Sequence, residues 1–324
     1  MMKAAVLHKI GESPRYEDFP DPTPTEDQLL VRVKAVAFEN IDKALANGTH
    51  YSASESQSNL PVVAGLDGIG MLDDGQLVGF GGVPAPYGSM AEKTLIPNGY
   101  YVPVPEGVDA VTAAAYPASV LTSLFPLKWG ANLQPGQTVL INGATGVSGK
   151  LAVQIAKVLG AGRVIGTGRN EASLKRVLEL GADAVIDLKQ PDDAIVTAFE
   201  REAGESGFDV ILDFLWGHPT ELLLKALTPH ELSFAKHKIR LVQIGEMADS
   251  TVSLPAEALR TSGLEIVGGA AGLTAEAMME GTNLVWDMIK DNKVHMDIEQ
   301  VPLKDIESVW RRGDFQGTRI VVIP

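Results

Sequence analysis

The chain has 324 residues, 45% of them hydrophobic and 21% charged, so it is long enough to form two globular domains. Its net charge of −14 argues against a nucleic-acid or anionic-membrane partner, because both need a positive surface. The absence of cysteine excludes disulfides, thiolate catalysis and zinc sites with cysteine ligands. The apolar run near the N-terminus is too short for a signal peptide, so we expect a cytoplasmic protein.

The first 110 residues predict a β-rich domain. The runs Lys3–His8 and Leu29–Phe38 are apolar and β-branched, and Pro, Gly and Asp are frequent between such runs. The longest uncharged run, Ala110–Leu127, contains two prolines. We therefore expect a buried helix with a broken end there, and no membrane span.

From about residue 113 to residue 271, strands alternate with helices. The expected strands are Thr138–Asn142, Val164–Thr167, Ala184–Asp187, Val210–Asp213, Arg240–Ile244 and Leu264–Val267. The expected helices are Lys150–Leu159, Glu171–Leu180 and Asp192–Ala203. This alternation predicts an α/β fold with a doubly wound parallel sheet. Beyond it, Ala275–Lys290 predicts a helix and Arg319–Ile323 a last strand that returns to the first domain.

A glycine-rich turn follows the first strand of this alternating region. Without side chains, the glycines let the backbone approach a pyrophosphate, and the N–H groups at the helix start face an anion. The residues expected to contact a dinucleotide here are Gly143, Ala144, Thr145, Gly146, Val147, Ser148 and Gly149. Ser148 either offers its hydroxyl to the pyrophosphate or caps the helix. The alternative is a glycine-rich turn in a domain that binds no ligand.

The end of the second strand selects between two nicotinamide cofactors. Sites for NAD usually place an acidic residue here, and a carboxylate would repel the 2′-phosphate of NADP. This chain instead has Gly168, which leaves room, and Arg169, which can bind the phosphate through charge-assisted hydrogen bonds. We therefore predict NADP(H), contacted by Thr167, Gly168, Arg169 and Asn170. The alternative for Arg169 is a solvated surface charge.

Several ordered segments carry a family resemblance. They are Gly65–Gly70, Gly88–Glu92, Val104–Val108, Leu133–Gly146, Leu180–Asp187 and Phe208–Asp213. As a set they resemble the medium-chain dehydrogenase/reductase superfamily, in its zinc-independent quinone oxidoreductase branch. The resemblance implies a Rossmann dinucleotide-binding domain over residues 118–271. It also implies a partly open, β-rich, GroES-like catalytic domain over residues 1–117 and 272–324.

The resemblance also bears on metal and cofactor contacts. Zinc-dependent members place a Cys where this chain has Glu39 and a His-Glu pair where it has Leu66-Asp67, so we expect no zinc. Residues after the later strands are expected to meet the nicotinamide half, because ligands bind at the carboxyl ends of such strands. By resemblance, the contacts on this half are Thr122, Ile244, Gly245 and Ala270, with the turn 214–217.

The catalytic residues follow from the same resemblance. Quinone reductases usually carry an Asn where this chain has Glu39, and the neighbouring Asn40 takes over that role if the loop is shifted. Tyr51 lies near a position where relatives often carry a cleft tyrosine, as proton donor or substrate contact; the alternative is a loop aromatic that packs on the domain. Asp42 either fixes its own loop or takes part in the chemistry.

These observations favour NADPH-dependent reduction of quinones or α,β-unsaturated carbonyls. Hydride addition to a conjugated acceptor spreads the charge into an enolate or phenolate, so no Lewis acid is needed. The alternatives are an alcohol or polyol dehydrogenase, and a low-turnover NADP-binding protein with a structural or regulatory role. The expected partners are a small-molecule substrate and a second copy of the chain, paired through edge strands such as Leu264–Val267.

Overall fold

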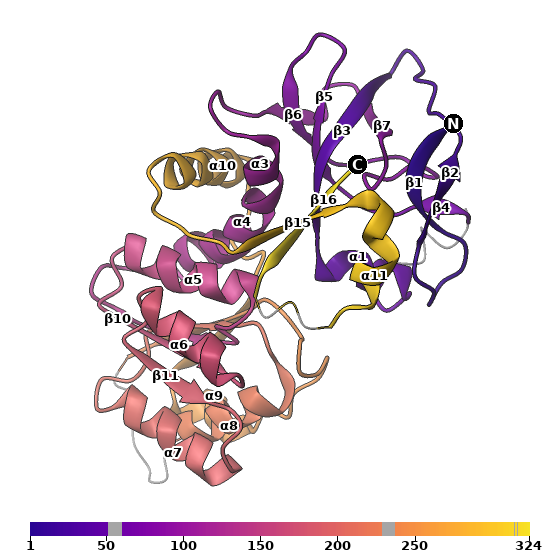
Figure 1. Ribbon diagram of the computed structural model, residues 1–324. Helices are drawn as coiled ribbons and strands as arrows, with labels where there is room; N and C mark the ends of the chain where they lie inside the picture. The colour runs from indigo at the N-terminus through magenta and orange to yellow at the C-terminus, as the bar shows by residue number, and fades with distance from the viewer. Residues whose placement is uncertain (51–59, 229–236, 314, 316) are drawn as a thin grey trace. The chain divides into compact units, whose positions relative to one another are not determined.

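The computed structural model describes residues 1–50, 60–228, 237–313, 315 and 317–324. It divides into two compact units, Met1–Tyr116 with Asp297–Pro324, and Pro117–Met296 (Figure 1). The sequence places residues 272–296 with the β-rich domain, whereas the structure places them in the second unit. The reason is packing, since helix α10 (Ala275–Lys290) lies against α4 (Pro117–Phe125), and a Cβ on Gly281 would be 3.1 Å from the ring of Phe125.

The first unit is built from two β-sheets. The three-stranded sheet has the order β2 (Arg15–Phe19), β1 (Met2–Leu7), β4 (Val62–Val63). The seven-stranded sheet runs β15 (Ile298–Pro302), β16 (Arg319–Ile323), β3 (Gln28–Phe38), β5 (Gly68–Met71), β6 (Leu77–Phe80), β8 (Tyr101–Pro103), and β7 (Lys93–Pro97) also pairs with β3. The helical segments are α1 (Asn40–Ala46), α3 (Ala110–Ala115), η3 (Leu303–Asp305) and α11 (Ile306–Arg311). This unit is the β-rich domain that the sequence predicts.

The C-terminal strand β16 completes the seven-stranded sheet. It lies parallel to β15 and antiparallel to β3, with Val322 opposite Val36. Ile320, Val321 and Val322 are buried, which explains the uninterrupted apolar character of the strand. The end of the chain therefore belongs to the core of the first unit, as the sequence predicts.

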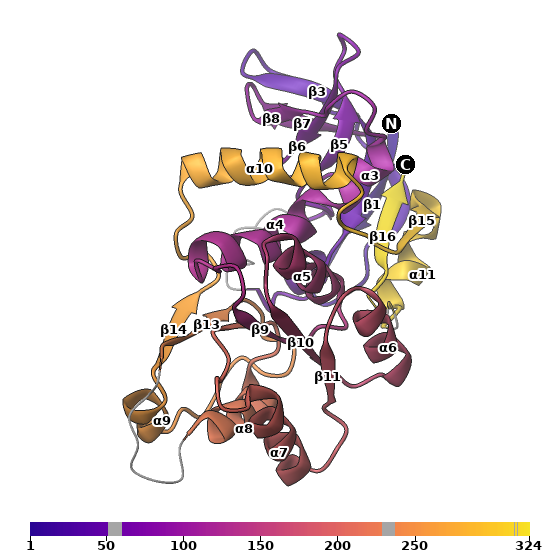
Figure 2. The ribbon, with the colours of Figure 1, turned by 90° about the vertical axis from the view of Figure 1, so that its left-hand side faces the viewer.

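The second unit is a six-stranded parallel sheet between helices. In sheet order the strands are β11 (Ala184–Asp187), β10 (Arg163–Gly168), β9 (Thr138–Asn142), β12 (Val210–Asp213), β13 (Ile239–Gln243) and β14 (Leu264–Gly268). The helices not yet given are η2 (Pro126–Gly130), α5 (Val147–Val158), α6 (Glu171–Glu179), α7 (Asp192–Ala203), α8 (Gly217–Leu227) and α9 (Ala256–Thr261). In Figure 2, α5 and α6 lie on one face of the sheet and α7 and α8 on the other. Numbered along the chain, the strand order is 3-2-1-4-5-6, which is the doubly wound Rossmann arrangement.

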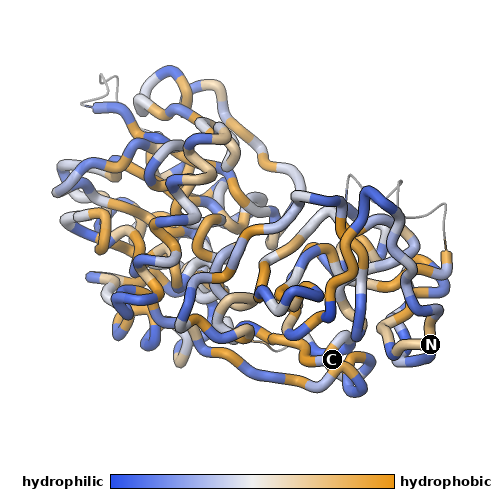
Figure 3. The backbone as a smooth tube through the Cα atoms, turned by 90° about the horizontal axis from the view of Figure 1, so that it is seen from above, coloured by the Kyte–Doolittle hydropathy of each residue, from blue (hydrophilic) through white to orange (hydrophobic). Residues whose placement is uncertain are grey.

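Buried apolar stretches account for most of the strands. In Figure 3, hydrophobic and hydrophilic stretches alternate along the tube, as expected for elements with one buried side. The segment Ala110–Gly130 is long and apolar enough to span a membrane by composition. In the structure it is divided among α3, α4 and η2, and its residues Val120, Leu124 and Leu127 are fully buried. The core that this segment forms accounts for its apolar character.

Candidate functional site

The turn between β9 and α5 is held closed by its own glycines. Gly143 has a φ of +96°, a backbone conformation that favours glycine. A Cβ on Gly149 would overlap the carbonyl oxygen of Gly143, so the helix packs directly on the turn. The N–H of Ala144 donates to the carbonyl of Thr167 on β10 at 2.8 Å. The fold of the turn therefore requires glycine at positions 143 and 149, whether or not a ligand binds there.

Gly146 plays a different part in this turn. It is the N-cap of α5, it is exposed, and no protein atom lies within 4 Å of the position of a Cβ. No side chain caps this twelve-residue helix. Its first N–H groups therefore need an outside acceptor, and the bare backbone at Gly146 leaves space for a phosphate. Ser148 is the second helical residue, so it is not the cap, and its carbonyl accepts a hydrogen bond from Ser123 Oγ at 2.8 Å.

Three of the predicted cofactor contacts, Gly168, Arg169 and Asn170, lie at the end of β10, and their surroundings differ. Gly168 makes room for Thr145, because a Cβ there would overlap Thr145 Cγ2. Asn170 caps α6, accepting a hydrogen bond from the N–H of Ser173 at 2.9 Å. Arg169 is exposed and makes no hydrogen bond or salt bridge among the residues that the structure describes. Its guanidinium is therefore available to a bound anion.

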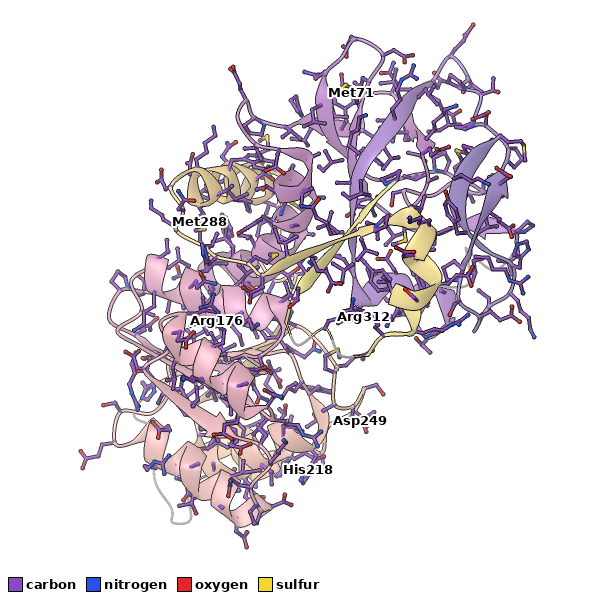
Figure 4. All side chains as sticks on the ribbon, in the orientation of Figure 1. Met71, Arg176, His218, Asp249, Met288 and Arg312 are labelled. Carbon is purple, nitrogen blue, oxygen red and sulfur yellow. The ribbon has the colours of Figure 1, made fainter. Side chains whose placement is uncertain are left out.

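The neighbouring cations on α6 are less suited to that role. Arg176, labelled in Figure 4, lies 3.3 Å from Glu179 Oε2 on the same helix. Lys175 is exposed on the same helix. These surroundings agree with the solvated helix face that charge patterning predicts for the pair.

The predicted contacts on the nicotinamide side lie at several elements of the second unit. Ile244 and Gly245 follow β13, and their N–H groups donate to the carbonyl of Asp213 at 2.8 and 3.1 Å. Ala270 is exposed just beyond β14. Thr122 is exposed on α4, with its hydroxyl donating to the carbonyl of Ala118 at 2.7 Å. The carboxyl ends of β12, β13 and β14 thus bring most of this set to one edge of the sheet.

A buried polar network lies beneath the glycine turn, and sequence reasoning found only one of its members. Asn142, Thr167, Asp213 and Thr220 all have no exposed surface. Thr167 Oγ1 accepts from the N–H of Gly143 at 2.9 Å and donates to Asn142 Oδ1 at 2.8 Å. The signal that could have found the others is a polar residue at the end of an apolar strand, such as Asn142 in β9 or Asp213 in β12.

The first unit contains a second group of ionisable residues. Arg319 Nη1, from β16, lies 3.1 Å from Glu39 Oε1 and donates to the carbonyl of Phe38 at 3.0 Å. Asp42 is buried near the start of α1 and accepts a hydrogen bond from the N–H of Glu39 at 2.8 Å. Burial raises the pKa of Asp42 to about 8, and the charges of Glu39 and Asp67 act in the same direction, while Arg319 opposes them. Asp42 therefore fixes the start of its own helix.

The same group of residues bears on metal binding. Asp67 is exposed, yet desolvation by the surrounding protein raises its pKa to about 6, and the charge of Glu39 adds to the rise. The positive charge of Arg319 opposes the rise in pKa at both Asp42 and Asp67. Among the described residues, no three His, Cys, Asp or Glu side chains form a group that could hold a metal ion. Of the residues at the expected zinc-ligand positions, Leu66 has no atom that can bind a metal, and Glu39 is already paired with Arg319.

The two other predicted catalytic residues are Asn40 and Tyr51. Asn40 is the first residue of α1 and is exposed. Tyr51 lies outside the residues that the structure describes.

Comparison with known proteins places the chain in a family. A sequence profile of the family described as zinc-binding dehydrogenase matches residues 148–281. The chain is 26% identical to a probable NADPH-dependent quinone reductase of Emericella nidulans, over 96% of both chains. It is 30% identical to an NAD-dependent alcohol dehydrogenase of Sulfolobus acidocaldarius, over 66% of this chain and 71% of that protein. A Pseudomonas syringae quinone oxidoreductase structure superposes with a TM-score of 0.82 and 24% identity over the whole of both chains. The chain belongs to the medium-chain dehydrogenase/reductase superfamily, in its quinone oxidoreductase-like branch.

Proposed function

We propose that the protein is an NADPH-dependent, zinc-independent reductase of quinones or α,β-unsaturated carbonyls. The observation that carries the proposal is the uncapped start of α5, where Gly146 leaves the backbone bare at the carboxyl edge of a parallel sheet. Such an edge, next to the point where the strand order reverses between β9 and β12, is where dinucleotides bind in this architecture. The turn from Gly143 to Gly149 would hold the pyrophosphate.

The choice of NADPH over NADH rests on Arg169. Its exposed guanidinium stands at the strand end where an NAD site carries an acidic residue, and it can bind the 2′-phosphate through paired hydrogen bonds. The related Emericella protein is described as NADPH-dependent, which supports the same choice. The turn 214–217, with Thr122, Ile244, Gly245 and Ala270, would meet the nicotinamide half.

The chemistry follows from what the protein's own residues can do. NADPH, when bound, supplies the hydride. Glu39 is paired with Arg319 and Leu66 has no ligand atom, which supports chemistry that does not depend on a Lewis acid to polarise the substrate. A conjugated acceptor needs only hydrogen-bond donors and a proton source, because it delocalises the charge that it receives. Quinones and enones are therefore the substrate classes that suit this chain.

Steady-state oxidation of NADPH with a panel of quinones and enones tests the proposal. We expect turnover with at least one conjugated acceptor and none with simple ketones or secondary alcohols. Turnover of alcohols with NADP⁺ would instead identify a dehydrogenase. Tight NADPH binding without turnover of any acceptor would identify a low-turnover binding protein. Absence of NADPH binding would refute the cofactor assignment itself.

Two finer assignments belong to the same proposal. Tyr51 is the proposed proton donor, with Asn40 as a substrate or ribose contact, and Tyr51→Phe should lower turnover of enones without changing the affinity for NADPH. Unchanged turnover would remove Tyr51 from this role. The protein is also proposed to be a homodimer that pairs through β14, which is one of the two edge strands of the six-stranded sheet. Light scattering coupled to gel filtration measures the mass directly, and a monomer mass would reject the dimer.

A further inference from the structure

The carboxylate of Asp213 receives four hydrogen bonds from four different donors. The N–H groups of Leu215 and Trp216 donate to Oδ1 at 3.0 and 3.1 Å. Asn142 Nδ2 donates to the same oxygen at 3.1 Å, and the hydroxyl of Thr220 donates to Oδ2 at 2.5 Å. An ionised carboxylate can accept all four hydrogen bonds. A protonated carboxyl group would carry a hydrogen that points toward one of these donors, and it would lose that hydrogen bond. Burial raises the pKa of Asp213, and these four donors oppose that rise.

The side chain of Asn142 extends this network to the glycine turn. Its Nδ2 faces Asp213 and Thr220, and its Oδ1 accepts from the hydroxyl of Thr167. Thr167 Oγ1 in turn accepts from the N–H of Gly143. Every step of this path has one donor and one acceptor, so the amide of Asn142 can adopt only one orientation. The path joins the ends of β9, β10 and β12 below the surface of the site.

The two turns at the ends of this path both have unusual backbones. Gly143 has a φ of +96° on one side, and Trp216 has a φ of +56° on the other. A bulky residue with positive φ is strained and persists only where its surroundings hold it. Here the N–H of Trp216 donates to Asp213, and a Cβ on the next residue, Gly217, would lie 2.5 Å from the Cβ of Asp249.

We propose that Asp213, Asn142 and Thr167 form a buried positioning relay that holds the glycine turn and the 214–217 turn in register. The consequence of the relay for cofactor binding rests on the proposed function. In that case the two halves of the dinucleotide would contact two turns that are both linked to the carboxylate of Asp213. None of the three relay side chains has exposed surface, so they act through the turns and touch no cofactor. Thr167 is thus a positioning residue, where the sequence alone predicts a direct contact.

Thr167→Val tests the relay, because it removes the hydroxyl and keeps the size of the side chain. In the cofactor-free protein, we expect hydrogen–deuterium exchange to become about tenfold faster at residues 214–217 as well as at residues 143–145. Thr167→Ser should restore the wild-type rates. Ser262→Ala removes a buried hydroxyl outside the relay and should leave both turns unchanged. Unchanged exchange at 214–217 in a folded Thr167→Val protein would overturn the relay.

A titration with NADPH then separates the relay from the proposed function. We expect the Kd of Thr167→Val to rise about tenfold, equivalent to about 1.4 kcal/mol, with recovery in Thr167→Ser. Asp213→Asn should weaken NADPH to a similar degree, and the double variant should be no weaker than either single variant, since all act on one path. If the increases in Kd of the two single variants multiplied in the double variant, the two residues would act independently, and the relay would be overturned. If the wild-type protein does not bind NADPH, the proposed function fails, and the exchange rates alone decide on the relay.

Discussion

Glu39 Oε1 lies 3.1 Å from Arg319 Nη1, an ion pair between residues near opposite ends of the chain. The pair is largely shielded from water, with exposed side-chain fractions of 23% and 8%. Arg319 also donates to the carbonyl of Phe38, so the guanidinium joins β16 to the end of β3. The positive charge of the pair also acts on the carboxyl groups of Asp42 and Asp67.

Removal of Arg319 should destabilise the protein strongly. Arg319→Met leaves the largely buried carboxylate of Glu39 without its cation, and we expect a loss of about 3 kcal/mol in the free energy of unfolding. Glu39→Gln should cost less, about 1 kcal/mol, because the amide oxygen still accepts from the guanidinium. Urea unfolding of both variants and of the double variant measures the coupling. Strictly additive losses would show that the ion pair contributes nothing beyond its separate parts.

The raised pKa of Asp42 predicts a pH dependence of stability. The folded protein holds this proton up to about pH 8, whereas the unfolded chain releases it near pH 3.8. Stability should therefore fall as the pH rises from about 4 to about 8, with a slope of up to about 1.4 kcal/mol per pH unit from this group. Asp42→Asn should remove that part of the slope and be more stable than the wild-type protein at pH 9. Asp27→Asn, at an exposed aspartate, is the control, and equal slopes in all three proteins would contradict the assignment.

Two glycine substitutions distinguish folding from cofactor binding. Gly149→Ala should lower the Tm, because its Cβ would overlap the carbonyl oxygen of Gly143. Gly146→Ala meets no protein atom and needs no unusual φ, so the protein should fold normally with a Tm close to that of the wild type. Its Kd for NADPH should nevertheless rise about tenfold if the pyrophosphate lies against this backbone. An unchanged Kd for Gly146→Ala would place the cofactor elsewhere.

Charge reversal at Arg169 tests the choice of cofactor. Arg169→Asp removes the proposed phosphate partner, and we expect KM for NADPH to rise at least about tenfold while KM for NADH changes little. Lys175→Asp makes the same kind of charge change on α6 and should affect both cofactors equally and weakly. Because Arg169 has no bonding partner among the described residues, its loss should leave the Tm unchanged. Equal changes in KM for the two cofactors would remove Arg169 from this role.

Local patterns determined most of the fold. The strands Thr138–Asn142 and Val210–Asp213 begin and end where the sequence predicts, because fully buried parallel strands are continuous apolar runs bounded by polar residues. The sequence predicts the glycine turn equally well, because the spacing of its glycines follows from contacts between residues a few positions apart. The composition also limited the metal chemistry, because a chain without cysteine cannot supply thiolate ligands.

Only the tertiary structure decided which distant side chains meet. The sequence does not indicate that Arg319 lies against Glu39, nor that Asp213 is joined to Thr167 through Asn142, because these contacts depend on the order of strands in a sheet. The same holds for Gly168, whose missing side chain makes room for Thr145, and for α10, which packs on the second unit. Periodicity reports which face of an element is buried, and the sheet order decides what that face touches.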